Sequence, residues 1–210
     1  MKDHKAALAS PPRMATGPAS APSAFPTLQT ERLVLREITL DDAEFWMRNF
    51  SDPEVVELTA WEPPRDLEAA KGEITQFCTR PLQEATGIRW GIALRGRPDL
   101  IGTLGYHQWI REGAHRARMG YDLLREHRRR GIMTEAMRAA LTYGFTTMGL
   151  HRVEVLTDPV NTASIRLVEG LGFHREGTLR ENTYFRGRFI DDVIFSLLRQ
   201  EWPAAGGAKH

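Results

Sequence analysis

The chain has 210 residues, of which 41% are hydrophobic, and this content suffices for one sizeable core without demanding two domains. Its 28 Lys and Arg residues almost balance its 27 Asp and Glu residues, so no global field favours nucleic acid or an anionic membrane as a partner. The single cysteine, Cys78, excludes an intrachain disulfide and a cysteine-based metal cluster.

Both ends of the chain differ in composition from its middle. Residues 1–26 are rich in Ala, Ser and Pro without apolar periodicity, and residues 203–210 have the same character. Such segments bury too little surface to offset the entropy of ordering, so we expect flexible tails around a single domain at 27–202. No apolar run approaches the roughly 18 residues of a membrane span, and no signal pattern opens the chain. We therefore expect a cytoplasmic protein without a membrane partner.

Hydrophobic spacing and turn residues predict a mixed order of strands and helices along this domain. The predicted elements are, in chain order, a strand at 30–36, helices starting at 40 and at 66, strands at 88–94, 100–109 and 116–124, a helix from 131, a strand at 151–157, a helix from 161, and strands at 173–179 and 188–198. This order predicts an α+β (three-layer α/β) fold, with a mainly antiparallel central sheet and helices on both faces.

The stretch from Leu123 to Glu135 combines a strand end, a basic turn and the start of an amphipathic helix. The first N–H groups of a helix lack backbone partners, and the helix dipole makes that end partly positive. Gly131 lets the backbone close on a bulky anion, and the three arginines at 128–130 add positive charge. The pattern predicts a phosphate or pyrophosphate site, although a solvated basic loop before a helix has the same residues.

Residues 128–133, Arg-Arg-Arg-Gly-Ile-Met, resemble the acetyl-CoA pyrophosphate loop of the GNAT acetyltransferase superfamily, whose pattern is Gln/Arg-x-x-Gly-x-Gly/Ala. Arg128 and Gly131 match this pattern, and Met133 departs from its last position. Further segments are similar, in the right order, to the ribosomal-protein N-terminal (alanine/serine) acetyltransferase branch. They are Thr30 to Arg36, Met119 to Tyr121, Thr134 to Ala136, Asn161 to Ser164 with Gly172 and Phe173, and Asp191 to Val193. The resemblance covers roughly residues 30–199.

The resemblance implies acetyl-CoA as cosubstrate. No metal is expected, because His115, His127 and His151 lack a metal-ligand spacing. The resemblance further implies that the strand ending at Leu123 splays from the strand near His151, so that the pantetheine arm lies in the gap like an extra strand. The expected coenzyme-binding residues are Leu123, Leu124, Arg128, Arg129, Arg130, Gly131, Ile132, Met133, Thr134, Asn161 and Ser164. Backbone N–H groups near Leu123 would also stabilise the oxyanion. Asn161 has the alternative role of a helix N-cap.

The resemblance also points to the group that protonates the leaving thiolate. In many GNAT enzymes this is a tyrosine, but the matching position here is Val168. In the ribosomal-protein branch, the serine matching Ser164 is the proposed substitute, acting alone or through water. A serine in the first turn of a helix also bonds its own backbone, so Ser164 has a structural alternative.

The sequence leaves the general base open. An amine with a pKa of about 8 at a protein N-terminus, or about 10 on a lysine, must lose a proton before attack. The candidates are Glu62 in a loop, His107 on a strand and Glu181 near the C-terminal strands. His107 has the alternative of a sheet histidine, the two glutamates that of surface charges, and water can relay the proton without a fixed base.

The leading hypothesis is an acetyl-CoA-dependent N-acetyltransferase in which a primary amine attacks the thioester directly. The acceptor is expected to be a protein N-terminus or else a small amine, such as a polyamine, an amino acid or an aminoglycoside. A nucleic-acid-binding module using Arg125 to Arg130 is disfavoured by the near-neutral charge and the lack of interleaved aromatics. The only support for a non-catalytic acetyl-CoA sensor is that Val168 replaces the usual tyrosine. A homodimer is compatible with the branch.

Overall fold

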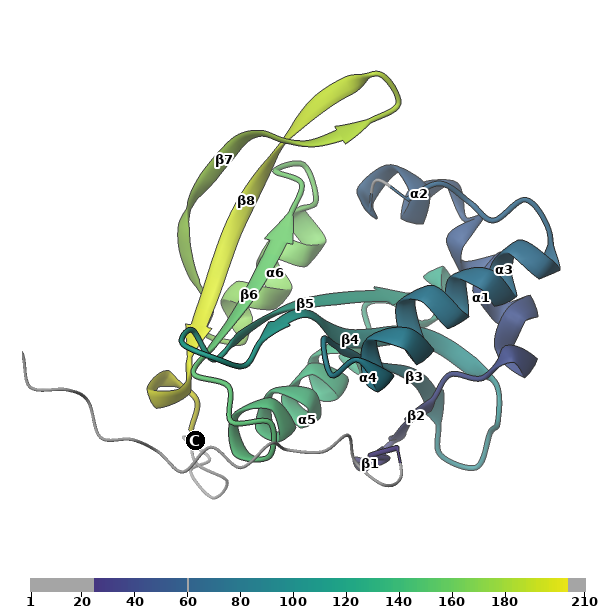
Figure 1. Cartoon of the computed structure of the whole chain (residues 1–210), viewed down its shortest axis with the longest axis horizontal. Coiled ribbons are helices and arrows are strands. Elements are labelled where there is room, and N and C mark those ends of the chain that lie inside the picture. The colour runs from purple at the N-terminus through teal and green to yellow at the C-terminus, as the bar shows by residue number, and fades with distance from the viewer. Residues whose placement is uncertain (1–24, 60, 204–210) are drawn as a thin grey trace, which may run out of the picture.

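The structure is a computed structural model that describes residues 25–59 and 61–203. Its strands are β1 (Leu28–Gln29), β2 (Leu33–Glu37), β3 (Ile88–Leu94), β4 (Leu100–Ile110), β5 (Arg116–Leu123), β6 (Arg152–Thr157), β7 (His174–Phe185) and β8 (Arg188–Leu198). They form one sheet in the order β1-β2-β3-β4-β5-β6-β8-β7 (Figure 1). Neighbours pair antiparallel except β5 and β6, which are parallel. The predicted α+β fold with a mainly antiparallel sheet is confirmed.

Helices cover both faces of this sheet, as predicted (Figure 1). They are α1 (Ala43–Phe50), α2 (Pro53–Thr59), α3 (Leu67–Ile74), α4 (Arg80–Gln83), α5 (Ile132–Thr146) and α6 (Thr162–Gly170), with short turns η1 (Leu40–Asp42), η2 (Thr75–Thr79), η3 (Arg125–His127) and η4 (Arg199–Glu201). Helix α5 packs on one face through Met137 and Leu141, while α1 and α3 cover the other through Trp46 and Ile74. No described helix is long and apolar enough to cross a membrane.

The sequence pattern missed the shortest elements, β1, α2 and α4. Helix α2 begins at Pro53, which suits a first helical position, but its seven residues are too few to show a periodic face. The single helix predicted from 66 is divided, because α3 ends at Ile74 and wider π turns continue to Thr79. Strand β7 runs past its predicted end at Leu179, since pairing with β8 resumes beyond an irregularity and continues to Phe185.

The described N-terminal residues pack onto the sheet. The ring of Phe25 meets Trp90 edge-on at 6.3 Å, and the Trp90 indole N–H donates to the Pro26 carbonyl at 2.7 Å. These contacts precede residue 27, where the sequence analysis places the start of the domain. The rest of the predicted tail at 1–26, and residues 204–210 of the other tail, lie outside the described residues.

Close packing of β3 against β4 makes a specific stability prediction at Gly105. A Cβ added there would collide with the Ile88 carbonyl oxygen and lie 2.6 Å from the Cα of Arg89. We expect Gly105→Ala to lower the free energy of unfolding by about 1–3 kcal/mol, because backbone atoms of β3 must move.

The control is Gly72→Ala in α3, where no heavy atom lies within 4 Å of the added Cβ. Replacing an exposed helical glycine by alanine raises the free energy of unfolding by about 0.5–1 kcal/mol. Gly72→Ala should therefore be more stable than the unmodified chain. Urea denaturation measures both differences. Equal stability of Gly105→Ala and the unmodified chain would contradict the packing described.

Candidate active site

Strands β5 and β6 pair over only part of their length. The described pairs are Arg116↔Arg152, Ala117↔Val153 and Arg118↔Glu154. Beyond them, β5 stays paired with β4 to its end at Leu123, while β6 turns away and pairs with β8 (Figure 1). The splayed strand pair that the resemblance predicts is therefore present.

Ion pairs hold the closed end of this gap. The buried carboxylate of Glu154 lies 3.0 Å from Arg116, 2.8 Å from Arg152 and 3.6 Å from Arg118. Burial alone would raise the pKa of Glu154, but hydrogen bonds and charge from Arg152 and Arg116 outweigh it and lower the pKa. Because two of the arginines are on β5 and Glu154 is on β6, the cluster joins the strands just where they part.

Strand β5 presents backbone groups to the gap. The Leu124 N–H donates to the Ile101 carbonyl on the β4 side at 2.8 Å. In an antiparallel ladder the backbone groups of alternate residues point to opposite sides, so those of Tyr121 and Leu123 point away from β4 and toward the gap. Such an edge can bond an extended ligand arm, and an N–H there can stabilise an oxyanion.

The turn after β5 leads into the start of α5, where backbone N–H groups lack helical partners. Arg129 and Gly131 have φ values of 61° and 71°, so the chain enters the left-handed region twice before α5. The first helical bond of α5 runs from the Glu135 N–H to the Gly131 carbonyl. The N–H groups of Ile132, Met133 and Thr134 precede this bond and lie at the positive end of the helix dipole.

Two residues of the first strand region brace this turn, and the sequence analysis assigned them no role in the site. Thr30 and Arg32 both bond the Glu135 carboxylate, the hydroxyl of Thr30 at 2.5 Å and the Arg32 Nε at 2.6 Å. Arg32 also donates to the Arg130 carbonyl at 3.1 Å. The only sequence signal for these contacts was that segments 30–36 and 134–136 both resemble the family. Residues of the two segments meet here in the structure.

The predicted coenzyme-binding residues divide into core and surface. Leu123 packs in the cluster under α5 and Leu124 in the cluster of α1 and α3, so only their backbone can serve a ligand. The Arg128 side chain donates to the Leu123 carbonyl at 2.9 Å and pairs with Glu54 at 2.8 Å. Arg129 and Arg130 are exposed beside the turn and add positive charge there.

On the α6 side of the gap, Ser164 is buried and hydrogen-bonded. Its N–H donates to the Asn161 side-chain oxygen at 3.0 Å, so Asn161 does cap α6. Its hydroxyl lies 2.7 Å from the phenol oxygen of Tyr121, a partner that the sequence analysis did not assign. Val168 is fully buried in the core and brings no hydroxyl to the site.

On the opposite face of β5, His107 lies among arginines. A Cβ added at Gly120 would lie 3.4 Å from both the His107 ring and the Arg89 guanidinium, so these two side chains share the space over Gly120. The His107 residue is open to solvent at its surface. Nevertheless, desolvation by the protein around the ring lowers its pKa to about 4, with further lowering by Arg89 and Arg118.

A buried polar cluster anchors α1 beneath this face. The Asp122 carboxylate accepts from the Asn49 amide at 2.6 Å and from the Thr103 N–H at 3.1 Å, and Arg89 lies 3.7 Å away. Burial raises the pKa of Asp122 against the opposing effects of Arg89 and the hydrogen bonds. The cluster ties α1 to β4 and β5 next to the gap.

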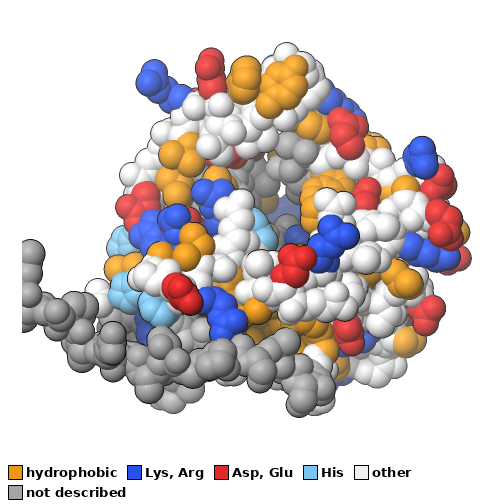
Figure 2. All heavy atoms as spheres, in the orientation of Figure 1, with side chains coloured by type: hydrophobic (Ala, Val, Ile, Leu, Met, Phe, Trp, Pro, Cys, Tyr) orange, Lys and Arg blue, Asp and Glu red, His pale blue; other side chains and the backbone are white. Residues whose placement is uncertain are grey.

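The other two candidate bases lie farther out. Glu62 is exposed and pairs at 3.5 Å with Arg186, at the tip of the β7–β8 hairpin. Arg188 of the same hairpin pairs with Glu57 of α2 at 3.0 Å. These contacts join the β7–β8 hairpin to α2 and the loop that follows it. Figure 2 shows a hollow in the middle of the side of the molecule that faces the viewer. Glu181 is exposed on β7 with a φ of 51°.

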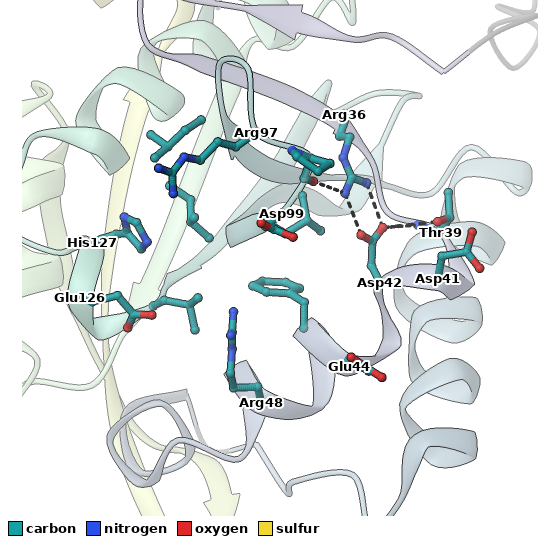
Figure 3. A pocket seen from close by; sticks show the side chains of 16 residues that line it. Arg36, Thr39, Asp41, Asp42, Glu44, Arg48, Arg97, Asp99, Glu126 and His127 are labelled. Atoms are coloured by element: carbon teal, nitrogen blue, oxygen red, sulfur yellow. Dashed lines mark hydrogen bonds and ion pairs between the residues drawn. The ribbon is translucent and has the colours of Figure 1, made fainter.

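A separate cavity of about 910 Å³ lies between α1 and the turn that joins β3 to β4. Arg48, Arg97 and Asp99 project into it, and His127 borders it from η3 (Figure 3). Neither Ser164 nor His107 lines it, so this cavity is not where those two predicted catalytic residues lie. Within residues 25–59 and 61–203, no group of three or more His, Cys, Asp or Glu residues is arranged to hold a metal ion.

Comparison with known proteins gives these features a family context. The acetyltransferase (GNAT) domain family matches residues 32–174. The uncharacterized N-acetyltransferase p20 of Bacillus licheniformis is 39% identical over 176 residues, which cover 84% of this chain and 98% of p20. The ribosomal protein uS5-alanine N-acetyltransferase of Escherichia coli (strain K12) is 27% identical over 184 residues, covering 83% of this chain and 92% of that enzyme.

Solved structures agree with the fold. That of Mycobacterium smegmatis RimJ in complex with CoA-disulfide superposes with a TM-score of 0.72 at 24% identity, covering 86% of this chain and 89% of RimJ. At this identity the likeness concerns the fold.

The lowered pKa of His107 predicts a pH dependence of stability. Between the ordinary histidine pKa of about 6.5 and the folded value of about 4, the unfolded chain binds more protons than the folded one. Stability should therefore be lost as pH falls through this window. We expect the thermal midpoint of His107→Gln to fall less steeply over this range than that of the unmodified chain.

Thermal unfolding followed by circular dichroism at pH 7, 6, 5 and 4 makes this comparison. His151→Gln, at an exposed position outside the cluster, controls for the loss of one imidazole from the chain. Identical slopes for His107→Gln and the unmodified chain would show that the folded structure does not oppose protonation of His107.

Proposed function

Because the chain belongs to the GNAT acetyltransferase family, we propose that it transfers the acetyl group of acetyl-CoA to the amine at the N-terminus of a protein. The observation that carries the coenzyme part is the continuity of β5 with the turn that starts α5. One wall of the gap leads directly into the turn and the free N–H groups at the start of α5. A ligand with an extended neutral arm and a diphosphate end suits that arrangement.

In this proposal the diphosphate accepts hydrogen bonds from the N–H groups of Ile132, Met133 and Thr134. The exposed guanidinium groups of Arg129 and Arg130 contribute charge, and the arm follows the backbone of β5. Arg128 acts indirectly, because its guanidinium holds the end of β5 against Glu54 of α2. Asn161 acts through its cap on α6, which fixes Ser164.

In this proposal, the residues that contact the amine and the residues near the sulfur lie on opposite faces of β5. The amine nitrogen forms a bond to the acetyl carbon, and the Leu123 N–H stabilises the oxyanion that results. The C–S bond then breaks and its electron pair stays on sulfur, near Ser164 on the α6 side. On the other side, His107 is uncharged near neutral pH, so its ring can accept a hydrogen bond from the attacking amine, whose proton then leaves to water. Glu62 and Glu181 are less suited, since one pairs with Arg186 and the other lies out on β7.

Two features support a protein N-terminus over a polyamine as the acceptor. A relative named for its action on ribosomal protein uS5 is similar over most of both chains. In addition, Arg89 and Arg118 disfavour a proton on His107, and the same positive potential opposes a substrate that carries several ammonium groups. A protein N-terminus brings one amine, whose pKa of about 8 lets it lose its charge easily.

A single small amine, such as an amino acid, is the second candidate acceptor. The ion pairs of Arg186 with Glu62 and of Arg188 with Glu57 join the hairpin to the α2 side, which narrows the approach from that side. A peptide acceptor requires these exposed pairs to open, at a cost of about 0–1 kcal/mol each.

The helix-start assignment makes a prediction at Gly131. Gly131→Glu places a carboxylate where the diphosphate would lie, so we expect loss of acetyl-CoA binding in calorimetry at unchanged secondary structure. The matched control is Gly149→Glu at the other end of α5, where the glycine has a φ of 70° and open space around it. This control carries the same backbone strain and should bind normally. Normal acetyl-CoA binding by Gly131→Glu would show that the diphosphate does not bind at this helix start.

The reaction itself is tested by thiol release from acetyl-CoA with N-terminal peptides, amino acids, polyamines and aminoglycosides as acceptors. We expect peptides to be the best acceptors, and Ser164→Ala to lower kcat roughly 100-fold while acetyl-CoA affinity changes little. Thr162→Ala, exposed in the same helix, is the control. Release only with polyamines would overturn the proposed acceptor. No release with any amine would favour the sensor, and normal turnover by Ser164→Ala would reduce Ser164 to a structural role.

A further inference from the structure

The hydrogen bond between Tyr121 and Ser164 joins β5 to α6 beneath the open part of the gap. The two hydroxyl oxygens lie 2.7 Å apart. The last described pair of β5 with β6 is at Arg118, so Tyr121 lies where the strands have already separated. No other described hydrogen bond joins these two elements across the gap, and this one involves the serine that the proposed reaction uses.

The surroundings of Ser164 leave its hydroxyl available for chemistry. Its backbone N–H is already capped by Asn161, so the serine hydroxyl does not have to cap the helix. The Ser164 side chain is buried, which protects its orientation from competing water. Two hydroxyls that share one hydrogen bond retain one further O–H donor between them. The direction of the shared bond therefore decides which oxygen presents that donor.

We propose that Tyr121 is a positioning residue, whose O–H donates to the Ser164 oxygen and so turns the Ser164 O–H toward the sulfur of the leaving thiolate. This inference rests on the proposed acetyl transfer. A phenol is a stronger acid than an aliphatic alcohol and hence the stronger donor, which favours this direction of the bond. Tyr121 thereby supports from β5 the role that a tyrosine at the position of Val168 would fill from α6.

Tyr121 does not supply the proton that the thiolate finally takes up. Burial raises the pKa of Tyr121 to about 12, although the hydrogen bond with Ser164 acts in the opposite direction. A thiol has a pKa of about 8.5, so transfer of a proton from Tyr121 to the thiolate is uphill. In the step proposed, the C–S bond breaks, sulfur keeps the electron pair, and the proton lost by the amine nitrogen reaches sulfur through solvent. The two hydroxyls stabilise the thiolate by hydrogen bonding and lose no proton in net.

Kinetics of Tyr121→Phe test the coupling. This variant keeps the ring and removes only the hydroxyl. We expect kcat to fall roughly tenfold, because one hydrogen bond of this kind is worth about one factor of ten in rate, with little change in the KM for acetyl-CoA. In the double variant with Ser164→Ala, the fall should be no larger than for Ser164→Ala alone. Unchanged kcat, or effects that multiply, would show that Tyr121 does not act through Ser164.

Titration of bound coenzyme A measures the pKa of its thiol, which would not change if Tyr121 had a purely structural role. The thiolate absorbs in the ultraviolet, so the pKa of the bound thiol can be followed directly in the protein–CoA complex. We expect this pKa to be higher in Tyr121→Phe and in Ser164→Ala than in the unmodified protein. The control is Tyr106→Phe on β4, which loses a buried hydroxyl that donates to the Ala140 carbonyl at 2.9 Å.

Tyr106→Phe should lower stability and leave the thiol titration unchanged. A thiol pKa that is the same in Tyr121→Phe and the unmodified protein would overturn the inference. If the unmodified protein binds CoA but releases no thiol with any amine, the proposed function fails while the titration still decides the role of Tyr121.

Discussion

The separation of β5 from β6 is the constraint on which the rest of the site depends. Each strand has a full antiparallel partner on its outer side, β4 for β5 and β8 for β6, and these pairings take the strands in different directions. The two strands pair in parallel over only three residue pairs, where Glu154 forms ion pairs with arginines of both strands. The inner edge of β5 beyond this point therefore keeps backbone groups for a ligand.

The turn at the open end of the gap is held in place from outside. Glu135 of α5 is bonded by Thr30 and Arg32, and Arg128 is bonded to the end of β5 and to Glu54. These contacts fix the left-handed turn and the helix start without occupying the first N–H groups of α5. If the proposed diphosphate binds here, a turn that is already held in place loses less conformational entropy on binding, which increases affinity without any added contact.

Strand β5 also separates two chemical environments. Its even-numbered side chains, the half-buried Arg118 and the buried Asp122 among them, lie on the same polar face as His107 and Arg89. Its odd-numbered side chains face α5 and α6, where Tyr121 meets Ser164. In the proposed reaction, the strand periodicity of two therefore places the groups assigned to the amine and the groups assigned to the sulfur on opposite sides of one backbone.

The sequence by itself determined the mixed α+β order, the family resemblance and the helix start at Gly131, because apolar periodicity and a glycine in a tight turn are local properties. The tertiary structure alone decided which side chains meet across the sheet: Arg32 with Glu135, Arg186 with Glu62, and Tyr121 with Ser164. It also showed that Arg128 is engaged by the protein and that Asn161 is a cap. The partners that meet across the sheet are far apart in the chain, and no local pattern specifies them, because they depend on how the strands twist and part once the core is packed.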